Sequence, residues 1–227
     1  MLNPNSFWDD FFGFLQRFIL MSPPPDLALP PAPSEEEEIM EVVDGWPLFE
    51  DGPLGEIPSG RKGMIETYGD PSITYTKKGT AKVSRAFARK LHTVPSDVIA
   101  GYRRRIYMHT LVAPYFREAM RRSVMVAPGY VFERIGCFNP RHMRHDKRRP
   151  LSDHTWGIAF DLNATENRAF YRKPTDPLPF EGGWKGFSDL PQSVVLAWES
   201  VGFTWGGRWG NSKRGGFCDP MHFSLRS

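Results

Sequence analysis

The sequence predicts an α+β fold in which a small, mainly antiparallel sheet is flanked by helices. Segments whose apolar residues have helical spacing come first, and short strand-like segments cluster later in the chain. This division favours an α+β arrangement over alternating βαβ units. The chain also has 21 prolines and 21 glycines, which indicate long loops or an irregular tail.

Three segments are expected to be helical. In residues 80–94 and 99–123, apolar side chains recur every three or four positions, which is the period of an amphipathic helix. The third segment, residues 188–202, carries residues typical of helix boundaries. These are a Ser or Asp cap, Pro191 in the first turn and Gly202 after the end.

Four segments are expected to be strands. The clearest is residues 157–163, in which Ile158 and Phe160 share one face and Ala159 and Asp161 share the other. The remaining three are residues 130–138, 203–207 and 221–226.

Residues 1–55 form a leader whose composition differs from that of the rest. It holds eleven acidic residues and one basic residue, Arg17, so it carries a net charge of −10. Residues 56–227 carry +13 (28 basic minus 15 acidic). Apolar residues at helical spacing predict an amphipathic helix at 6–21, and a proline-rich, then acidic stretch predicts a linker at 22–38. We therefore expect an irregular, partly disordered leader before a folded domain at 56–227.

The expected helix at residues 6–21 has two possible roles. It can dock on a partner or a membrane surface, or it can pack on its own domain. It does not resemble a secretory signal, because two aspartates rather than basic residues precede the apolar stretch and Arg17 interrupts it.

Composition excludes several classes of protein. With 40% hydrophobic residues the chain can bury a core, so it is not wholly disordered. Two cysteines are too few for a disulfide scaffold, and no run of about 18 apolar residues is present to span a membrane. The basic body could attract nucleic acid or an anionic wall polymer, but no recognised nucleic-acid-binding pattern supports the first.

Two segments carry residues that suit a metal site: SDHTWGIAFDLN (152–163), and WGGRW followed by DPMHF (205–223). His154, Asp161 and His222 offer two imidazoles and one carboxylate, a set that leaves the fourth position of a catalytic zinc open. Asp219 precedes His222 by three residues, which span at most about 10 Å. Its carboxylate can therefore reach a water on the same metal and act as general base, then as acid.

These two segments resemble the signatures of the VanY-like zinc D-alanyl-D-alanine carboxypeptidases and L-alanyl-D-glutamate endopeptidases, a family that includes many phage endolysins. The first signature is S-x-H-x-x-G-x-A-x-D, and the second is W-G-G followed by an acidic residue, two others and His. Both occur here in the family's order. GMIETYGDP (63–71) also resembles the opening segment of some relatives, so the similarity covers most of 56–227 and excludes the leader.

The resemblance implies roles for four residues. His154, Asp161 and His222 are expected to bind one Zn²⁺ ion, and Asp219 is expected to be the catalytic base that assists the attack of zinc-bound water. The same resemblance implies that the small sheet carries the zinc site.

The family also uses an arginine upstream of the first histidine to hold the scissile carbonyl and the oxyanion. A fixed cation aimed at the developing charge would stabilise the tetrahedral state. The candidates are Arg141 and Arg144, and we prefer Arg141 because it lies nearest the end of the expected strand at 130–138.

Further side chains near the motifs are candidates for substrate contact. Ser152 is expected to hydrogen-bond substrate or to cap a turn. Trp205, with Trp156 and Trp209, is expected to wall a groove for an extended peptide or to pack in the core.

Cys137 and Cys218 flank the motifs, and the sequence leaves their state open. They can form a disulfide or remain as two buried free thiols, which the missing secretory signal favours.

The resemblance implies a zinc peptidase that cleaves the stem peptides of bacterial peptidoglycan. We expect cleavage of the L-alanyl-D-glutamate bond, with D-Ala-D-Ala cleavage as the alternative. A non-catalytic wall-binding or virion-structural module on the same fold is a second alternative. The expected place of action is the bacterial cell wall, as a phage lysin or a virion-associated enzyme.

Overall fold

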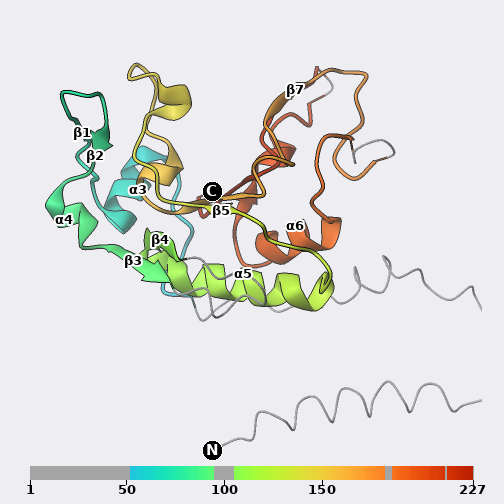
Figure 1. Cartoon of the computed structure of the whole chain (residues 1–227), viewed down its shortest axis with the longest axis horizontal. Helices are drawn as coiled ribbons and strands as arrows, with labels where there is room; N and C mark the ends of the chain where they lie inside the picture. Colours follow the sequence, from blue (N-terminus) through green and yellow to red (C-terminus); the bar gives the residue numbers. More distant parts are fainter. Residues whose placement is uncertain (1–51, 95–104, 182–185, 213, 227) are drawn as a thin grey trace, which may run out of the picture. The chain divides into compact units, whose positions relative to one another are not determined.

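The computed structural model describes residues 52–94, 105–181, 186–212 and 214–226, all within the unit Glu36–Ser227 (Figure 1). The leader helix expected at 6–21 and the linker expected at 22–38 lie outside these residues. Among the described helices, none has the length and apolar character needed to cross a membrane.

The described elements are short helices and short strands, which confirms the expected α+β class. The α-helices are α3 (Gly60–Tyr68), α4 (Arg85–Ala88), α5 (Ala113–Val126) and α6 (Gln192–Glu199). Four 3-10 turns accompany them in the described residues: η2 (Thr110–Val112), η3 (Met143–His145), η4 (Asp153–Thr155) and η6 (Gly206–Arg208). The strands are β1 (Thr74–Tyr75), β2 (Ala81–Lys82), β3 (Leu91–Val94), β4 (Ile106–His109), β5 (Ile135–Gly136), β6 (Ala159–Leu162), β7 (Phe170–Arg172), β8 (Thr204–Trp205), β9 (Gly216–Cys218) and β10 (His222–Ser224).

The largest described sheet has four antiparallel strands in the order β5-β6-β10-β8. Three further pairs are also antiparallel: β1 with β2, β3 with β4, and β7 with β9. The central strands β6 and β10 come from opposite ends of the motif region, so their pairing joins the two signatures.

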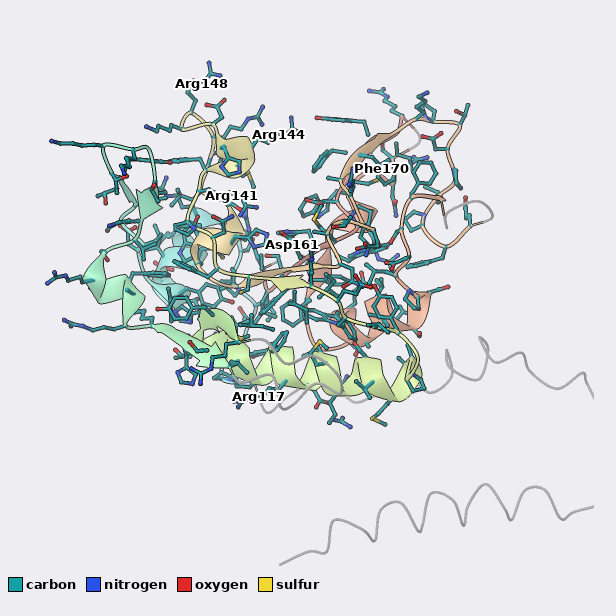
Figure 2. The ribbon with its side chains drawn as sticks, viewed as in Figure 1. Arg117, Arg141, Arg144, Arg148, Asp161 and Phe170 are labelled. Atoms are coloured by element: carbon teal, nitrogen blue, oxygen red, sulfur yellow. The ribbon has the colours of Figure 1, made fainter. Side chains whose placement is uncertain are left out.

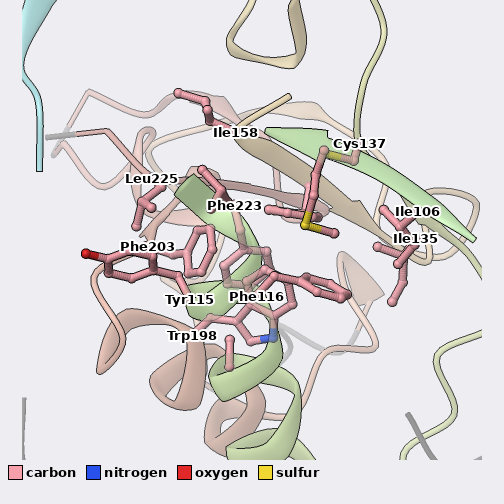
Figure 3. Close-up of a cluster of buried hydrophobic side chains, with 14 of the residues drawn as sticks. Ile106, Tyr115, Phe116, Ile135, Cys137, Ile158, Trp198, Phe203, Phe223 and Leu225 are labelled. Carbon is pink, nitrogen blue, oxygen red and sulfur yellow. The ribbon is translucent and has the colours of Figure 1, made fainter. Parts of the chain in front are cut away.

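One face of this sheet packs against α5 and α6 (Figure 3). Phe160 of β6 and Phe223 of β10 are cross-strand partners. Phe116 of α5 stacks on Phe160 with the ring centres 4.8 Å apart. The ring centre of Trp198, in α6, lies 5.5 Å from that of Phe160 and 4.9 Å from that of Phe223. Because side chains alternate along a strand, the neighbours of these two phenylalanines point to the other face of the sheet.

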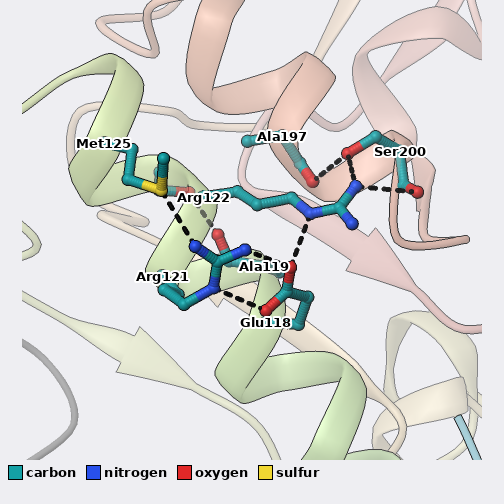
Figure 4. A network of polar contacts seen from close by, with 8 residues as sticks. Glu118, Ala119, Arg121, Arg122, Met125, Ala197 and Ser200 are labelled. Carbon is teal, nitrogen blue, oxygen red and sulfur yellow. Dashed lines mark hydrogen bonds and ion pairs between the residues drawn. The ribbon is translucent and has the colours of Figure 1, made fainter. Parts of the chain in front are cut away.

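A polar network within α5 also reaches the end of α6, through hydrogen bonds from Arg122 to Ser200 (Figure 4). The Arg122 side chain is 4% exposed and donates to Glu118 at 2.8 Å and to the Ser200 hydroxyl at 2.9 Å. Glu118 also accepts two hydrogen bonds from Arg121, at the surface. The two helices that support the sheet are therefore tied by a charged network as well as by apolar contacts.

The helix expected at residues 80–94 is wrong. The segment forms β2, the four-residue α4 and then β3, which pairs along its length with β4. Phe87, Leu91 and Val94 have helical spacing, yet they reach the core from a short helix followed by a strand. Ser84 starts α4 by accepting a hydrogen bond from the Phe87 N–H, as an N-cap does.

The helix expected at residues 99–123 is correct only in its second half. Residues 99–104 lie outside the described part, Ile106–His109 is strand β4, and α5 begins at Ala113. Pro114 lies at the start of α5. A proline in a helix interior lacks the N–H donor and clashes with the preceding turn, so the helix can begin at this position but not run through it.

The later elements match their expectations more closely. Helix α6 lies within 188–202, with Pro191 as its N-cap residue and Gly202 beyond its end at φ 106°. The expected strand at 157–163 contains β6, whereas only Ile135–Gly136 of 130–138 is a strand. The segments 203–207 and 221–226 contain β8 and β10.

Candidate metal centre and active site

Two of the expected metal ligands are direct neighbours in the sheet. Asp161 of β6 and His222 of β10 are cross-strand partners. Since Phe160 and Phe223 point into the core, Asp161 and His222 point to the opposite face, away from α5 and α6. Figure 2 labels Asp161 on this side of the sheet. The sheet register therefore brings the two signatures into contact.

The third expected ligand, His154, comes from the turn η4. Its Nδ1 lies 2.7 Å from the carbonyl oxygen of Cys137. A carbonyl can only accept, so Nδ1 carries the proton and Nε2 presents its lone pair. This is the arrangement by which a protein fixes the orientation of a metal-binding imidazole.

The three ligand atoms form a nearly equilateral triangle. His154 Nε2 lies 3.1 Å from Asp161 Oδ1 and 3.2 Å from His222 Nδ1, and the last two atoms are 3.2 Å apart. Zinc bonds of about 2.0–2.1 Å in a tetrahedron place ligand atoms about 3.3 Å apart. The residues therefore fit a zinc ion, and in the described part of the chain they form the one such group of His, Cys, Asp and Glu.

The charges of these groups are strongly coupled. Burial by itself raises the pKa of Asp161, but the neighbouring imidazoles of His154 and His222 outweigh it and hold that pKa well below its usual value. Burial by itself lowers the pKa of His222, but the Asp161 carboxylate outweighs it and raises that pKa. A metal ion competes with protons for these ligand atoms, so metal binding weakens as the pH falls.

Asp219 lies beside the ligands and has an unusual carboxylate. Its Oδ1 is buried and has no hydrogen-bond partner among the described residues. Burial raises the pKa of this carboxyl, His222 opposes that rise, and Asp161 adds to it. A buried carboxylate with a raised pKa and a free oxygen is suited to general acid–base chemistry.

Gly206, in the W-G-G segment, makes room for this arrangement. A Cβ at Gly206 would lie 2.6 Å from the Asp219 carbonyl oxygen, 3.1 Å from the Asp219 Cβ and 3.2 Å from the His222 Cβ. The Asp219 N–H donates to the Gly206 carbonyl at 3.0 Å. The glycine thus lets the turn η6 contact the base and one ligand directly.

The structure separates the two candidate arginines. Arg141 and Asp219 line the same cavity, and the positive charge of Arg141 works against the burial that raises the pKa of Asp219. Among the described residues, nothing hydrogen-bonds to the Arg141 guanidinium. Arg144 instead lies against the antiparallel pair β7–β9, where it donates to the Tyr171 hydroxyl at 2.5 Å and stacks 5.1 Å from the centre of the Phe217 ring. Arg141 is therefore better placed for chemistry near Asp219.

The other expected contact residues divide between the cavity and the core. Ser152 lines the cavity, and its side chain makes no capping hydrogen bond to η4. Trp205 does not fit its expected contact with substrate, because it is 2% exposed and its indole N–H donates to the Pro220 carbonyl. The tryptophan that lines the cavity is Trp209, which is 50% exposed.

A cavity of about 560 Å³ joins these groups. His154, His222 and Asp219 line it together with side chains from the loop 141–153, from strands β8 and β9, from Trp209 and from the end of β10. Figure 2 shows Arg141, Arg144 and Arg148 on the loop at one side. The metal ligands therefore face an opening large enough for several residues of a peptide.

Sequence reasoning missed part of this cavity. Asp153, Arg149, Phe217 and Arg226 also line it. Arg226 follows His222 by four residues, so strand alternation could have placed it on the same face.

The two cysteines, Cys137 and Cys218, are buried free thiols. The first also contributes the carbonyl that orients His154.

The fold and the triangle of ligands define a candidate metal centre beside a partly buried carboxylate. Residues 145–225 match the model of the protein family described as D-alanyl-D-alanine carboxypeptidase. The match confirms the resemblance to the VanY-like family over this segment, and it supports a metallopeptidase that acts on peptidoglycan. The matched segment contains the three ligands and Asp219; Arg141, Arg144 and Arg226 lie outside it. No curated protein and no solved structure matches the chain significantly.

Proposed function

We propose that the protein is a zinc-dependent peptidoglycan peptidase that cleaves stem peptides. The observation that carries this proposal is the free, buried oxygen of Asp219, whose side chain lines the same cavity as His154 and His222 of the ligand triangle. A metal-ligand set alone would also suit a structural site. A carboxylate held beside the ligands without a partner among the described residues is what hydrolysis needs in addition.

Each residue of the site has its own role in the proposed hydrolysis. His154, Asp161 and His222 would hold the zinc ion, which when bound supplies Lewis acidity and makes a coordinated water more acidic. Asp219 takes the proton from the attacking water and later gives it to the leaving amine. Its raised pKa, caused first by burial, suits both steps, because the carboxylate holds a proton more readily than an exposed aspartate does. Arg141 stabilises the negative charge that develops on the scissile carbonyl oxygen.

We propose the L-alanyl-D-glutamate bond as the bond that is cut, which follows the similarity to phage endolysins in the sequence. The second candidate is the D-Ala-D-Ala bond. It is favoured by the description of the family whose model matches residues 145–225. Both reactions use the same three ligands, base and arginine.

The test is mass spectrometry of purified peptidoglycan after treatment with zinc-loaded wild type, Asp219→Ala and Asp219→Asn. The asparagine keeps the shape of the side chain but cannot take a proton. We expect new stem-peptide fragments from wild type, whose termini name the bond, and a loss of about 10²–10⁴-fold in rate in both variants. Zinc content of each protein is the control for folding.

A non-catalytic module on the same fold gives a different result. Fragments from none of the three proteins, despite one bound zinc in each, would contradict the peptidase proposal and favour a wall-binding or virion-structural role.

We also propose that the protein acts on the bacterial wall as a phage lysin or a virion-associated enzyme, with residues 1–55 docking on a membrane surface or a virion partner. The apolar stripe at residues 6–21 supports this role. Deletion of 1–55 should preserve cleavage of purified peptidoglycan and reduce lysis of whole cells. Unchanged lysis and unchanged particle association would rule out the docking role.

A further inference from the structure

The cavity beside the metal ligands is positively charged. Four arginines line it, whereas two aspartates do, Asp153 and Asp219. The lining side chains therefore carry a net charge of +2 (four minus two) when all are ionised. A bound divalent metal with its one aspartate would add to this positive charge. Such a cavity favours a ligand that carries a carboxylate.

Three of the four arginines have a contact or a proposed role described above. Arg144 stacks on the side chains of the β7–β9 strand pair. Arg149 is half exposed and forms a 3.9 Å ion pair with Asp146. Arg141 lines the cavity together with Asp219 and is the arginine proposed above to stabilise the developing negative charge. The fourth, Arg226, has no role in the mechanism described above.

Arg226 is held by the same segments that hold the metal ligands. Its Nη1 donates to Asp153 Oδ1 at 3.0 Å, and the other oxygen of Asp153 accepts a hydrogen bond from the Ser224 hydroxyl at 2.8 Å. Asp153 directly precedes His154, and Ser224 lies two residues after His222. The guanidinium therefore has a fixed position relative to the metal centre.

The backbone around Arg226 is also fixed. Its carbonyl accepts from the Thr204 hydroxyl at 3.1 Å, and the preceding carbonyl, of Leu225, accepts from the Tyr68 hydroxyl at 2.9 Å. Asp153 is paired through both oxygens, and one Nη of Arg226 is engaged. The rest of the guanidinium edge remains for a ligand in the cavity.

We propose that Arg226 binds the free carboxylate of the substrate residue whose nitrogen is the leaving group. This inference rests on the proposed peptidase function, but it is independent of which bond is cut. In L-alanyl-D-glutamate, the glutamate is linked onward through its γ-carboxyl, so its α-carboxylate is free. In D-Ala-D-Ala, the terminal alanine has a free α-carboxylate. Both place a carboxylate on the carbon attached to the leaving nitrogen.

The recognition is that of a planar guanidinium for a carboxylate. Asp153 is the positioning residue that orients Arg226, and Ser224 supports Asp153. Arginine at such a site provides donors in a fixed plane, which lysine does not. The substrate residue on the leaving side is thereby aligned before the bond is cut.

The experiment compares matched peptides. The acid form is N-acetyl-L-Ala-γ-D-Glu-L-Lys-D-Ala-D-Ala, and two analogues carry an amide in place of the glutamate α-carboxylate or of the C-terminal carboxylate. Wild type, Arg226→Gln, Arg226→Lys and Arg117→Gln are assayed with zinc bound. Arg117 is the matched control, because it is exposed on α5, away from the cavity lining (Figure 2).

Wild type is expected to prefer the acid over the analogue amidated on the leaving side by about ten- to hundredfold in kcat/KM, mostly through KM. Arg226→Gln should reduce this preference to within about threefold, Arg226→Lys should keep part of it, and Arg117→Gln should match wild type. Equal zinc content and thermal stability would show that the variants are folded.

Two results would overturn the inference while leaving the peptidase intact: wild type cleaving acid and amide equally, or Arg226→Gln keeping the full preference. If Arg226→Gln does not fold, the inference is tested by wild type and Arg226→Lys alone. An equal preference for the acid over the amidated peptide in these two proteins would then contradict it. Failure of zinc-loaded wild type to cleave any of the peptides would overturn the proposed function, and this inference with it.

Discussion

His109 makes the stability of the domain depend on pH in a way that can be calculated. The residue ends strand β4 and is 2% exposed. Its Nε2 lies 3.1 Å from the Tyr68 carbonyl, and its Nδ1 accepts from the Leu111 N–H at 3.2 Å. The carbonyl needs a proton on Nε2 and the amide needs a lone pair on Nδ1, so the neutral ring satisfies both. A second proton, on Nδ1, would point at the Leu111 N–H and remove the hydrogen bond that this N–H donates.

The magnitude follows from the shift in pKa. Burial lowers the pKa of His109 from 6.5 to about 4, and the nearby charge of Lys90 acts in the same direction. The unfolded chain therefore binds this proton more tightly than the folded protein. Stability is fully present above about pH 6.5 and is lost as the pH falls through 4. At 1.36 kcal/mol per unit, the full loss is about 3 kcal/mol, of which about 2 kcal/mol falls between pH 7 and pH 5.

The assay is urea unfolding of the metal-free protein between pH 7.5 and pH 4.5, with tryptophan fluorescence as the signal. Other groups titrate in this range, so the quantity of interest is the difference between wild type and His109→Gln. The control is His92→Gln, because His92 is an exposed histidine on the adjacent strand β3. His109→Gln should lose about 2 kcal/mol less than wild type between pH 7 and pH 5, and His92→Gln should follow wild type. Parallel curves for wild type and His109→Gln would refute the reasoning.

Three further predictions concern the site and its support. Gly206→Ala should destabilise the domain by about 1–3 kcal/mol and reduce kcat/KM at least about tenfold, because the added Cβ overlaps backbone of the proposed base. Gly129→Ala, whose Cβ would contact nothing within 4 Å, should change neither quantity in the same assays. Arg122→Ala should cost about 3 kcal/mol in urea unfolding, since it leaves a partly buried carboxylate without its buried partner, whereas Arg121→Ala at the exposed side of the same carboxylate should cost under about 1 kcal/mol. Free zinc at about a thousand times its Kd should stabilise the wild type by about 4 kcal/mol in thermal unfolding, and His154→Ala should abolish that gain; an equal gain in both would place the metal elsewhere.

The sequence predicted much of the metal centre because the chemistry there depends on residue type and local spacing. His154 and Asp161 lie seven residues apart around a turn and a strand, so the chain itself brings them close. The class of fold was also predictable, because α6 and β6 carry strong local signals. The assigned roles of these residues remain predictions for the experiments above.

The sequence was least informative where local patterns are shared by helices and strands. The apolar spacing in 80–94 fits a helix, but pairing of β3 with β4 decides the outcome, and that pairing involves residues distant in the chain. The same holds for the tryptophans. Trp205 and Trp209 are four residues apart beside the same glycines, and only packing against Phe223 and Pro220 places the first in the core.

By itself, then, the sequence determined which residues can hold zinc and move a proton, since imidazoles and carboxylates bring that chemistry with them. The tertiary structure decided that Arg141 and Arg226 line the same cavity as Asp219, and that Asp153 holds Arg226 after the end of β10. It also showed that the Asp219 oxygen lacks a partner among the described residues. These properties depend on distances between segments far apart in the chain, and such distances are set by sheet register and core packing.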